Sequence, residues 1–226
     1  MRAMILAAGK GERMRPLTEH RPKPLLEVGG KPLLQYHVEN LVTAGFTELV
    51  VNISWLGEQI EAFLESRDWG CDIHCSREES PLETAGGIIQ ALPLLGETPF
   101  ALVNGDTWTD YPLEELRKQR DAAPAGAWLV LVDNPPQHPA GDFFLCEDGR
   151  LLRDVPENQV RLTYSGIAII DPALFRDAVP GKQPLLPFLE RGIKDGLVRG
   201  VHYGGVWEDV GTPERLRALD ERLAIH

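Results

Sequence analysis

The sequence predicts a single α/β domain built on a mostly parallel mixed sheet with helices on both faces. Through about residue 120, short apolar runs typical of strands alternate with stretches whose apolar residues recur at helical spacing. The chain has 226 residues, 43% hydrophobic and 25% charged, so it is long enough to bury one sizeable core without disulfides or a structural metal. We therefore expect one three-layer fold over residues 1–226.

The first half carries the clearest alternation. The predicted strands are residues 2–7, 48–53, 71–75 and 99–103. The predicted helices lie over residues 33–42, around 60–64 and over 86–95, the last with Pro93 near its end. Strands that alternate with helices in this way pair in parallel, because each helix carries the chain back across the sheet.

The second half is less regular. Apolar runs predict strands at residues 127–132, 162–170 and 206–210. Residues 142–147 and 150–155 predict a hairpin in which Asp148 and Gly149 form the turn. A helix is expected after Pro172, and another after Thr212, which would cap it with Pro213 in its first position.

Secretion and membrane insertion are both disfavoured. The opening apolar segment ends at Gly9 and Lys10, which is too short for a signal peptide, and no apolar run approaches the ~20 residues of a spanning helix. Cys71 and Cys75 would lie ~13 Å apart on a strand, beyond disulfide reach. We expect reduced cysteines, a cytoplasmic location and no membrane partner.

The charge is unevenly distributed. The net charge of −11 argues against a general nucleic-acid binder. Residues 1–31 nevertheless hold seven cations against three acids, a net of +4, so the rest of the chain carries −15. A cationic segment in an acidic protein favours capture of a small polyanion; the alternative is an ordinary solvated basic face.

A glycine-rich segment follows the first predicted strand. Its small residues, from Ala7 to Gly11, allow a ligand to approach the backbone, whose N–H groups then cradle phosphate oxygens. Arg13, Arg15 and Lys23 add positive charge nearby. The segment lacks the Gly-Lys-Ser/Thr ending of a P-loop, and Met14 replaces the third glycine of a dinucleotide fingerprint. By itself the segment is equally compatible with a tight turn.

The wider pattern resembles the sugar-1-phosphate nucleotidyltransferases. The N-terminal motif is G-x-G-x-R-x-x-P-L-T, starting at Gly9, followed by P-K-P at residues 22–24. Further matching segments are LETAGG (82–87), LVNGD (102–106), SGI (165–167) and WEDVGT (207–212). Residues 103–110, 131–135 and 141–143 make the chain most similar to the members that act on N-acetylmuramate 1-phosphate, and the resemblance covers essentially the whole chain.

The resemblance implies a Rossmann-like fold with a nucleotide-binding half at residues 1–120 and a sugar-binding half at 121–226. It implies transfer of UMP from UTP to N-acetylmuramate 1-phosphate, with release of pyrophosphate, in cell-wall sugar recycling. The attacking phosphate oxygen is already anionic, so the reaction needs charge neutralisation and alignment rather than a general base.

The resemblance also implies the catalytic residues and the cofactor. Arg15 would stabilise the departing pyrophosphate, and Lys23 would contact the triphosphate. Asp106 and Asp209 each follow an apolar strand, where open α/β sheets bind ligands. The family correspondence pairs these two aspartates as ligands of Mg²⁺, with Asp209 near the sugar phosphate.

The binding residues are expected in two groups. The UTP group is Ala8, Gly9, Gly11, Glu12, Arg13, Lys23, Pro81 and Gly86. The sugar-phosphate group is Asn104, Asp142, Gly166 and Asp209. For the lactyl carboxylate of muramate, Arg153 and Arg161 are available cations, but the sequence does not place them near the sugar.

The sequence is also compatible with two alternative functions. One is another sugar-1-phosphate nucleotidyltransferase, such as a mannose-1-phosphate guanylyltransferase or a glucose-1-phosphate thymidylyltransferase. The other is a catalytically silent relative that binds a nucleotide sugar and regulates a partner. A monomer is expected, because no appended assembly domain is visible in the sequence.

Overall fold

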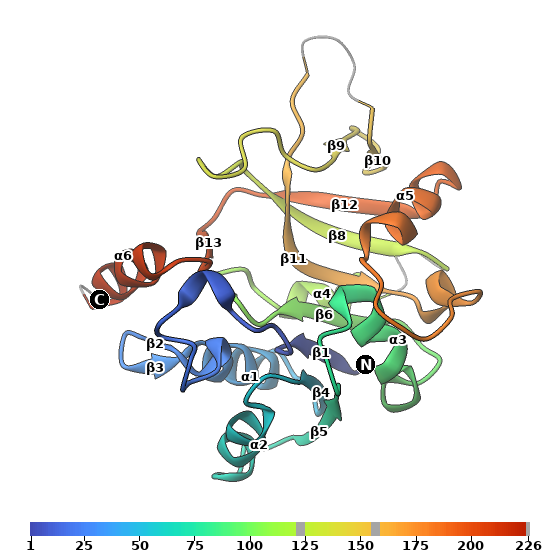
Figure 1. Ribbon diagram of the computed structural model, residues 1–226. Coiled ribbons are helices and arrows are strands. Elements are labelled where there is room, and N and C mark those ends of the chain that lie inside the picture. The colour runs from blue at the N-terminus through green and yellow to red at the C-terminus, as the bar shows by residue number, and fades with distance from the viewer. Residues whose placement is uncertain (121–124, 155–158, 225–226) are drawn as a thin grey trace.

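The computed structural model describes residues 1–120, 125–154 and 159–224. A seven-stranded sheet runs through the whole molecule (Figure 1). Its strands, in order across the sheet, are β12 (Val198–Tyr203), β8 (Ala127–Val132), β11 (Thr163–Ile170), β6 (Phe100–Asn104), β1 (Ala3–Leu6), β4 (Glu48–Ile53) and β5 (Asp72–Arg77). β11 runs antiparallel to both of its neighbours, and the other pairs are parallel. The sheet is therefore mostly parallel and mixed, as predicted.

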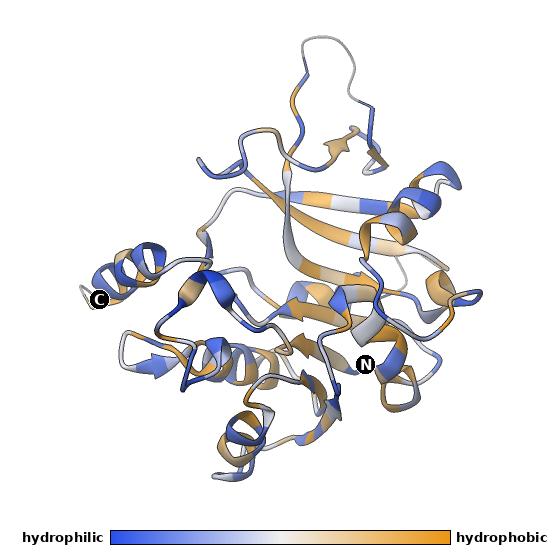
Figure 2. Ribbon diagram, viewed as in Figure 1, coloured by the Kyte–Doolittle hydropathy of each residue, from blue (hydrophilic) through white to orange (hydrophobic). Residues whose placement is uncertain are grey.

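Alternating apolar side chains give the sheet two buried faces. In β1, Ala3 and Ile5 face one core and Met4 faces the other, because successive strand residues point to opposite sides. The first core includes side chains of α1 (Leu33–Thr43), α2 (Gly57–Glu65) and α4 (Glu114–Lys118). The second includes α3 (Glu83–Leu95), η3 (Pro172–Phe175) and α5 (Leu186–Lys194). Figure 2 shows apolar strands between helices whose outer sides are polar.

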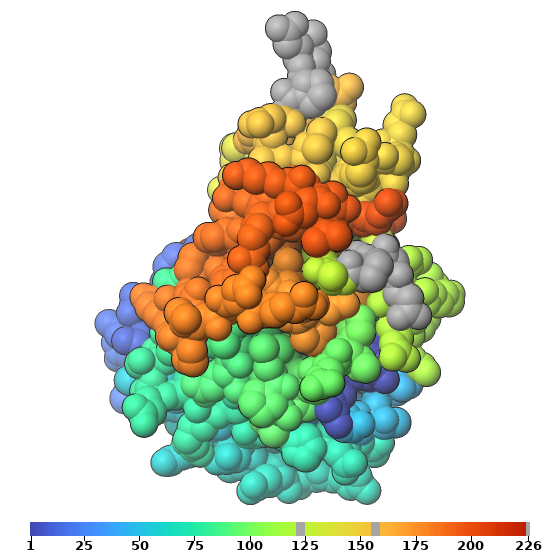
Figure 3. All heavy atoms as spheres, turned by 90° about the vertical axis from the view of Figure 1, so that its right-hand side faces the viewer, coloured from blue at the N-terminus to red at the C-terminus, as the bar shows by residue number. Residues whose placement is uncertain are grey.

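The second half of the chain packs directly on the first. Leu174, Phe175 and Phe188 share the second core with Ile88 and Ala91 of α3. Figure 3 shows this face, with the orange residues of η3 and α5 lying against the green residues of α3. One sheet thus continues through both halves, and the assignment of a nucleotide half and a sugar half stays a prediction.

Short elements surround the carboxyl ends of the central strands. They are the turns η1 (Glu12–Met14) and η2 (Lys23–Leu25), the pair β2 (Glu27–Val28) and β3 (Lys31–Pro32), the pair β7 (Thr107–Thr109) and β13 (Trp207–Asp209), and α6 (Pro213–Leu223). Met14, Val28, Val210 and Leu219 belong to a third apolar cluster, which fastens these elements together. The Thr212 side chain caps α6 by accepting from the Arg215 N–H.

The structure departs from the predicted elements in the second half. The helix expected after Pro172 is only the 3-10 turn η3. The predicted hairpin is shorter, with β9 (Phe144–Leu145) and β10 (Leu151–Leu152) around Gly149, and its predicted last residue, Val155, lies outside the described residues. β12 and α5 were not predicted, because their apolar residues are too few to stand out locally. Across the described ranges, no helix has both the length and the apolar character needed to cross a membrane.

Candidate active site

The glycine-rich loop after β1 is held in one shape by side chains from elsewhere in the chain. The Ala7 N–H donates to Asn52 Oδ1 (2.7 Å), and the Thr18 hydroxyl donates to the Gly11 carbonyl (2.8 Å). Gly11 has a φ of +62°, and a Cβ there would lie 2.8 Å from the Thr18 side chain. The position therefore needs glycine on both conformational and steric grounds. Ala7 and Ala8 are buried at the start of the loop, whereas Gly9 and Lys10 are exposed.

Two cavities open beside this loop, and a third, which contains no loop residue, shares part of its lining with them. The inner cavity is lined by Leu6, Ala7, Ala8, Gly9, Lys23, Pro24, Asn52, Glu78, Pro81, Glu83, Thr84, Asn104, Gly105 and Asp106. The loop cavity is lined by Gly9, Lys10, Gly11, Glu12, Arg13, Met14, Lys23, Pro81, Asp106, Lys182 and Gly211. The β11 cavity is lined by Asn104, Asp106, Thr107, Pro135, Gln137, His138, Thr163, Tyr164, Ser165, Trp207 and Asp209. Asp106 belongs to all three.

Asp106 is paired with the buried Lys23. Lys23 Nζ lies 2.7 Å from Asp106 Oδ2, and the exposed fractions of the two side chains are 9% and 41%. Lys23 opens the short turn η2 between Pro22 and Pro24, so its backbone has little freedom. This arrangement fixes one positive and one negative charge where the three cavities meet.

Asp209 lines the β11 cavity together with Asp106, but it lies on a different kind of strand from the one predicted. Its strand, β13, is not part of the main sheet but pairs antiparallel with β7, so the expectation that Asp209 ends a main-sheet strand is wrong. The register places Asp209 opposite Thr107, and the Val210 N–H donates to the Asp106 carbonyl (3.0 Å). Both aspartates therefore line the β11 cavity. Arg215 Nη1 lies 2.6 Å from Asp209 Oδ2.

The two aspartates are a chemically suitable pair for a hard divalent cation. Within the described ranges, no cluster of three or more His, Cys, Asp or Glu side chains is placed to hold a metal ion. Mg²⁺ is commonly bound by one or two carboxylates, with phosphate and water oxygens completing its shell. A pair of carboxylates beside an N–H-rich loop and several cations fits that mode, and does not fit a metal site made of protein ligands alone.

The seven cations of the first 31 residues comprise three in ion pairs elsewhere, three at the loop cavity, and Arg15 in neither set. Arg2, Arg21 and Lys31 form ion pairs with Glu48, Glu27 and Glu39, outside the three cavities. Lys10, Arg13 and Lys23 line the loop cavity together with Gly11 and Glu12. Arg15 is exposed just after η1 and lines none of the three cavities. The local excess of positive charge is thus concentrated at one cavity.

A further cation comes from the second half of the chain. Lys182 lines the loop cavity, and its Nζ lies 3.3 Å from Glu83 Oε1. Its neighbour Gln183 exchanges backbone hydrogen bonds with α3, donating to the Leu82 carbonyl and accepting from the Gly86 N–H. Lys182 was not predicted as a site residue, because nothing in the local sequence indicates that this loop crosses to α3.

Gly86 leaves room for the loop that contains Lys182 and Gln183 to pass close to α3, and it lines none of the three cavities. A Cβ at Gly86 would lie 2.3 Å from the Gly181 carbonyl oxygen, so any side chain there would push the loop away. Pro81, by contrast, lines both the inner and the loop cavity, and Ala8 and Gly9 line the inner one. Of the predicted UTP-binding residues, the structure therefore brings all but Gly86 to these two cavities.

Two buried polar residues, also missed from the sequence, brace the inner cavity. Asn52 and Glu78 are each 3% exposed. Asn52 Nδ2 donates to Glu78 Oε1 (2.6 Å), and Glu78 Oε2 accepts from the Leu82 N–H (2.9 Å). Since Asn52 also accepts from Ala7, this chain of bonds joins the glycine loop to the start of α3. An asparagine at the end of an apolar strand was the one available sequence signal.

Asn104 lines both the inner and the β11 cavity, whereas Gly166 packs against Asn104 and lines none of the three cavities. Gly166 has a φ of +82°, and a Cβ there would lie 2.5 Å from the Asn104 amide. Gly166 sits where the pairing of β11 with β8 shifts register, which is typical of a β-bulge. Trp207 joins β13 to this strand by donating its indole N–H to the Ser165 carbonyl (2.8 Å).

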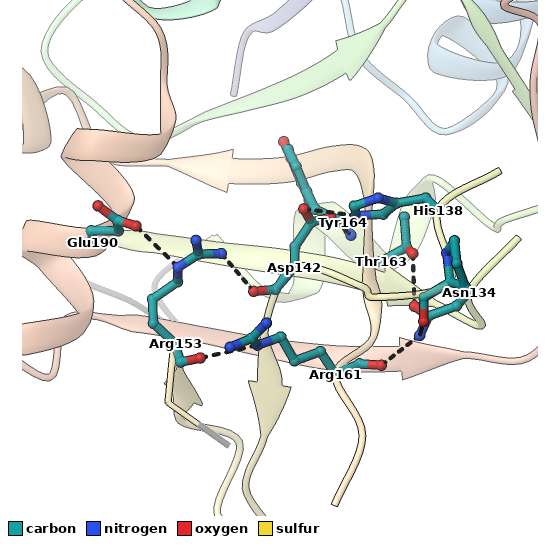
Figure 4. A network of polar contacts seen from close by, with 9 residues as sticks. Asn134, His138, Asp142, Arg153, Arg161, Thr163, Tyr164 and Glu190 are labelled. Carbon is teal, nitrogen blue, oxygen red and sulfur yellow. Dashed lines mark hydrogen bonds and ion pairs between the residues drawn. The ribbon is translucent and has the colours of Figure 1, made fainter.

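Asp142 lies behind the β11 cavity, where it holds two residues of the lining. Its Oδ1 is 3.1 Å from His138 Nε2, and its Oδ2 accepts from the Tyr164 N–H (2.8 Å). Figure 4 shows these contacts and those of Arg153 and Arg161 beside them. The predicted sugar residues Asn104 and Asp209 line the cavity, whereas Asp142 positions residues that do.

His37 is the buried titratable group beneath this site. Burial lowers its pKa to about 4, despite a backbone hydrogen bond with Thr107 and the nearby charge of Asp106. Its Nε2 is buried and has no hydrogen-bond partner in the described structure. The neutral imidazole therefore supports the β7 segment from within the core. For Tyr164 the pKa is raised instead, mainly by burial and to a smaller extent by the negative charge of Asp142.

Comparison with known protein families agrees with the motif pattern and the geometry. The family model described as nucleotidyl transferase matches residues 2–153. The matched range contains the glycine loop, Lys23, Pro81 and Asp106, and the alignment of whole relatives extends the similarity to the rest of the chain.

Two curated relatives and one solved structure are similar over nearly the full length. N-acetylmuramate alpha-1-phosphate uridylyltransferase from Neisseria meningitidis is 47% identical, with 96% of each chain covered. The enzyme of the same name from Caulobacter vibrioides is 38% identical, covering 98% of this chain and 96% of its own. HddC from Yersinia pseudotuberculosis, solved with GMP-PN, superposes with a TM-score of 0.82 over 98% of each chain at 22% identity, which shows the shared fold.

Proposed function

The chain belongs to the nucleotidyl transferase family, and from that premise we propose that it transfers UMP from UTP to N-acetylmuramate 1-phosphate. The products are UDP-N-acetylmuramate and pyrophosphate. The substrates are those named for the relatives at 47% and 38% identity. The observation that carries the proposal is the position of Asp106, paired with Lys23 and next to Asp209, where three cavities meet.

Each cavity takes one part of the reactants in this proposal. The uracil and ribose occupy the inner cavity, against Ala8, Gly9 and Pro81. The triphosphate lies in the loop cavity, where the N–H groups around Gly11 and the cations Arg13, Lys23 and Lys182 offset its charge. The sugar phosphate enters the β11 cavity, beside Asn104 and Asp209 and against the bulge at Gly166.

The reaction joins two anions that repel each other. A phosphate oxygen of the sugar 1-phosphate attacks the α-phosphorus of UTP, and the bond to the β-phosphate oxygen breaks as pyrophosphate leaves with that electron pair. Lys23 stays next to the α-phosphate and stabilises the charge that develops there. Arg15, exposed and adjacent to Met14 of the loop cavity, acts on the departing pyrophosphate.

Asp106 and Asp209 would hold the metal that this chemistry needs. When bound, Mg²⁺ would neutralise part of the negative charge of the reacting phosphates. Asp106 offers its carboxylate from the end of β6, and Asp209 offers its own from β13. The ion pairs with Lys23 and Arg215 keep both carboxylates oriented in the free protein.

We further propose that the protein acts as a monomer in the cytoplasm, in the recycling of cell-wall sugars. A single chain contains all three cavities, so the proposed site needs no residue from a second copy. Cytoplasmic UTP is its nucleotide substrate, and neither nucleic acid nor a membrane takes part.

A substrate panel tests the proposed function. Four nucleoside triphosphates, each combined with N-acetylmuramate, N-acetylglucosamine, mannose and glucose 1-phosphates, would be assayed for pyrophosphate release with Mg²⁺. We expect the highest kcat/KM for UTP with N-acetylmuramate 1-phosphate. A preference for GTP with mannose 1-phosphate would contradict the proposal, and so would tight binding of UDP-N-acetylmuramate by a protein with no turnover.

A further inference from the structure

The β11 cavity contains one group suited to an anionic part of the sugar. Among the described residues of its lining, the acids are Asp106 and Asp209, and the one side chain able to carry a positive charge is His138. N-acetylmuramate differs from N-acetylglucosamine by a lactic acid joined through an ether, so it brings a carboxylate into a cavity that already holds two. An imidazolium or another donor must offset that charge.

The two arginines near the cavity are engaged elsewhere. Arg153 Nη1 donates to the Asp142 carbonyl (2.8 Å), and its Nε lies 3.0 Å from Glu190 Oε1. Arg161 Nε donates to the Arg153 carbonyl (3.0 Å). Neither lines the β11 cavity, and Figure 4 shows the Arg153 guanidinium at Asp142 and the Arg161 guanidinium at the Arg153 carbonyl.

His138 is fixed by its backbone and by its ring. Its N–H donates to the Pro135 carbonyl (2.8 Å), which closes the turn that follows β8. On the ring, Nε2 lies 3.1 Å from Asp142 Oδ1, and Asp142 is itself anchored by the Tyr164 N–H. Nδ1 has no hydrogen-bond partner within the described part of the chain. Of the two ring nitrogens, one is thus held by a carboxylate and the other has no partner among the described residues.

We propose that His138 binds the lactyl carboxylate of the sugar substrate through Nδ1–H. This inference rests on the proposed function and names the residue that selects its sugar. In the bound state the ring lies between two carboxylates, that of Asp142 and that of the substrate. Asp142 is then a positioning residue, because it sets the orientation of the ring without touching the sugar.

The decisive variant is His138→Gln, compared with the matched control His202→Gln. His202 Nε2 lies 2.9 Å from Asp133 Oδ1, and its side chain is 40% exposed against 42% for His138, but it lines none of the three cavities. The control thus removes the same kind of contact at the same exposure. Binding of N-acetylmuramate 1-phosphate and of N-acetylglucosamine 1-phosphate would be measured by calorimetry, with Mg²⁺ and a non-hydrolysable UTP analogue present.

We expect His138→Gln to weaken binding of N-acetylmuramate 1-phosphate by roughly 10- to 100-fold, the effect of losing one hydrogen bond to a charged group. Binding of N-acetylglucosamine 1-phosphate should be unchanged, as should both affinities in His202→Gln. An analogue with a lactyl carboxamide should bind wild type and His138→Gln alike, because the amide carries no charge.

Two results would overturn the role of His138. If both sugar phosphates lose affinity equally, His138 serves the phosphate or the fold; if neither does, His138 has no part in binding. These results differ from failure of the proposed function, in which the wild-type enzyme itself would not bind or turn over N-acetylmuramate 1-phosphate.

Discussion

The backbone N–H of Val210 donates a 3.0 Å hydrogen bond to the carbonyl of Asp106, and this bond ties together two segments far apart in the chain. It continues the antiparallel pairing of β7 with β13, in which Asp209 stands opposite Thr107. The proposed metal ligands thus owe their proximity to a two-stranded ribbon outside the main sheet. The ribbon is anchored by Val210, which is buried in the third apolar cluster.

Asp209→Asn should lower turnover by roughly 100-fold and raise the Mg²⁺ concentration needed for half-maximal rate. The variant keeps the shape of the side chain but removes the charge that a divalent cation requires. Pyrophosphate release measured across a Mg²⁺ titration tests this. Glu208→Gln is the control, because Glu208 is the adjacent residue and pairs with Arg222 at the surface. Equal Mg²⁺ dependence in wild type and Asp209→Asn would exclude Asp209 as a ligand.

Lys23→Ala should lower turnover by roughly 10²–10³ at saturating UTP, the effect of losing one preorganised charge-stabilising donor. Lys23 is nearly buried and its Nζ lies 2.7 Å from Asp106 Oδ2, so alanine removes a charge that is held in a fixed position. Lys31→Ala, which breaks the ion pair with Glu39 outside the cavities, should retain full activity. A Lys23→Ala enzyme that works at the wild-type rate would refute the assigned role.

Lys182→Met should raise the KM for UTP by about tenfold while leaving the affinity for UMP unchanged. Lys182 lines the loop cavity with Arg13 and Lys23 but not the inner cavity, so it acts on phosphates beyond the first. A charge-assisted hydrogen bond of about 1.4 kcal/mol accounts for this factor. Lys194→Met, on the outer side of α5, serves as the control. If UMP binding weakens as much as UTP binding, Lys182 does not distinguish the phosphates.

The strands and helices of the main sheet were predictable because their signals are local. The continuous apolar run of β4 reports burial of both faces of a strand, and the spacing of Leu34, Val38 and Leu41 reports burial of one face of α1. The register of β7 with β13, by contrast, depends on tertiary packing between distant segments. Sequence periodicity carries no information about such a pairing, so the resemblance to a family, and not the pattern of residues, joined Asp106 to Asp209.

Asn52, Glu78 and Lys182 were missed because each acts through segments that are not adjacent in the sequence, and His138 was missed because it lines a cavity built from several segments. Asn52 and Glu78 join the glycine loop to α3, and Lys182 arrives from a loop of the second half. His138 gains its significance only from Asp142 and the cavity beside it. In each case the residue type is ordinary, and the contact that gives it a role is set by how separate elements pack.

Two glycines should respond in opposite ways to alanine. A Cβ at Gly86 would meet the Gly181 carbonyl at 2.3 Å, whereas one at Gly9 has no atom within 4 Å. Gly86→Ala should therefore lower stability by roughly 1–3 kcal/mol, or roughly 2–12 °C in Tm. Gly9→Ala should keep or slightly raise Tm but raise the KM for UTP, since its methyl group occupies space beside two ligand cavities. Thermal melts and UTP titrations of both variants separate the two effects. A lower Tm for Gly9→Ala would show that this glycine serves the fold.

The stability of the protein should fall as the pH drops below neutral, and His37 should account for a defined part of that loss. Burial lowers its pKa from 6.5 to about 4, so between these values the unfolded chain binds a proton that the folded protein excludes. Stability is then full above pH 6.5 and declines toward pH 4, by roughly 3 kcal/mol in total and roughly 2 kcal/mol between pH 7 and pH 5.

A variant is needed to isolate the contribution of His37. Asp148, whose pKa is lowered by hydrogen bonds from Arg150, also lowers the stability as the pH falls, but at lower pH. In His37→Leu, the loss between pH 7 and pH 5, measured by urea unfolding, should be smaller than in wild type by about that 2 kcal/mol. Identical losses in the two proteins would mean that the pKa of His37 is the same in the folded and unfolded states. The β7 segment would then tolerate a charged imidazole beneath it.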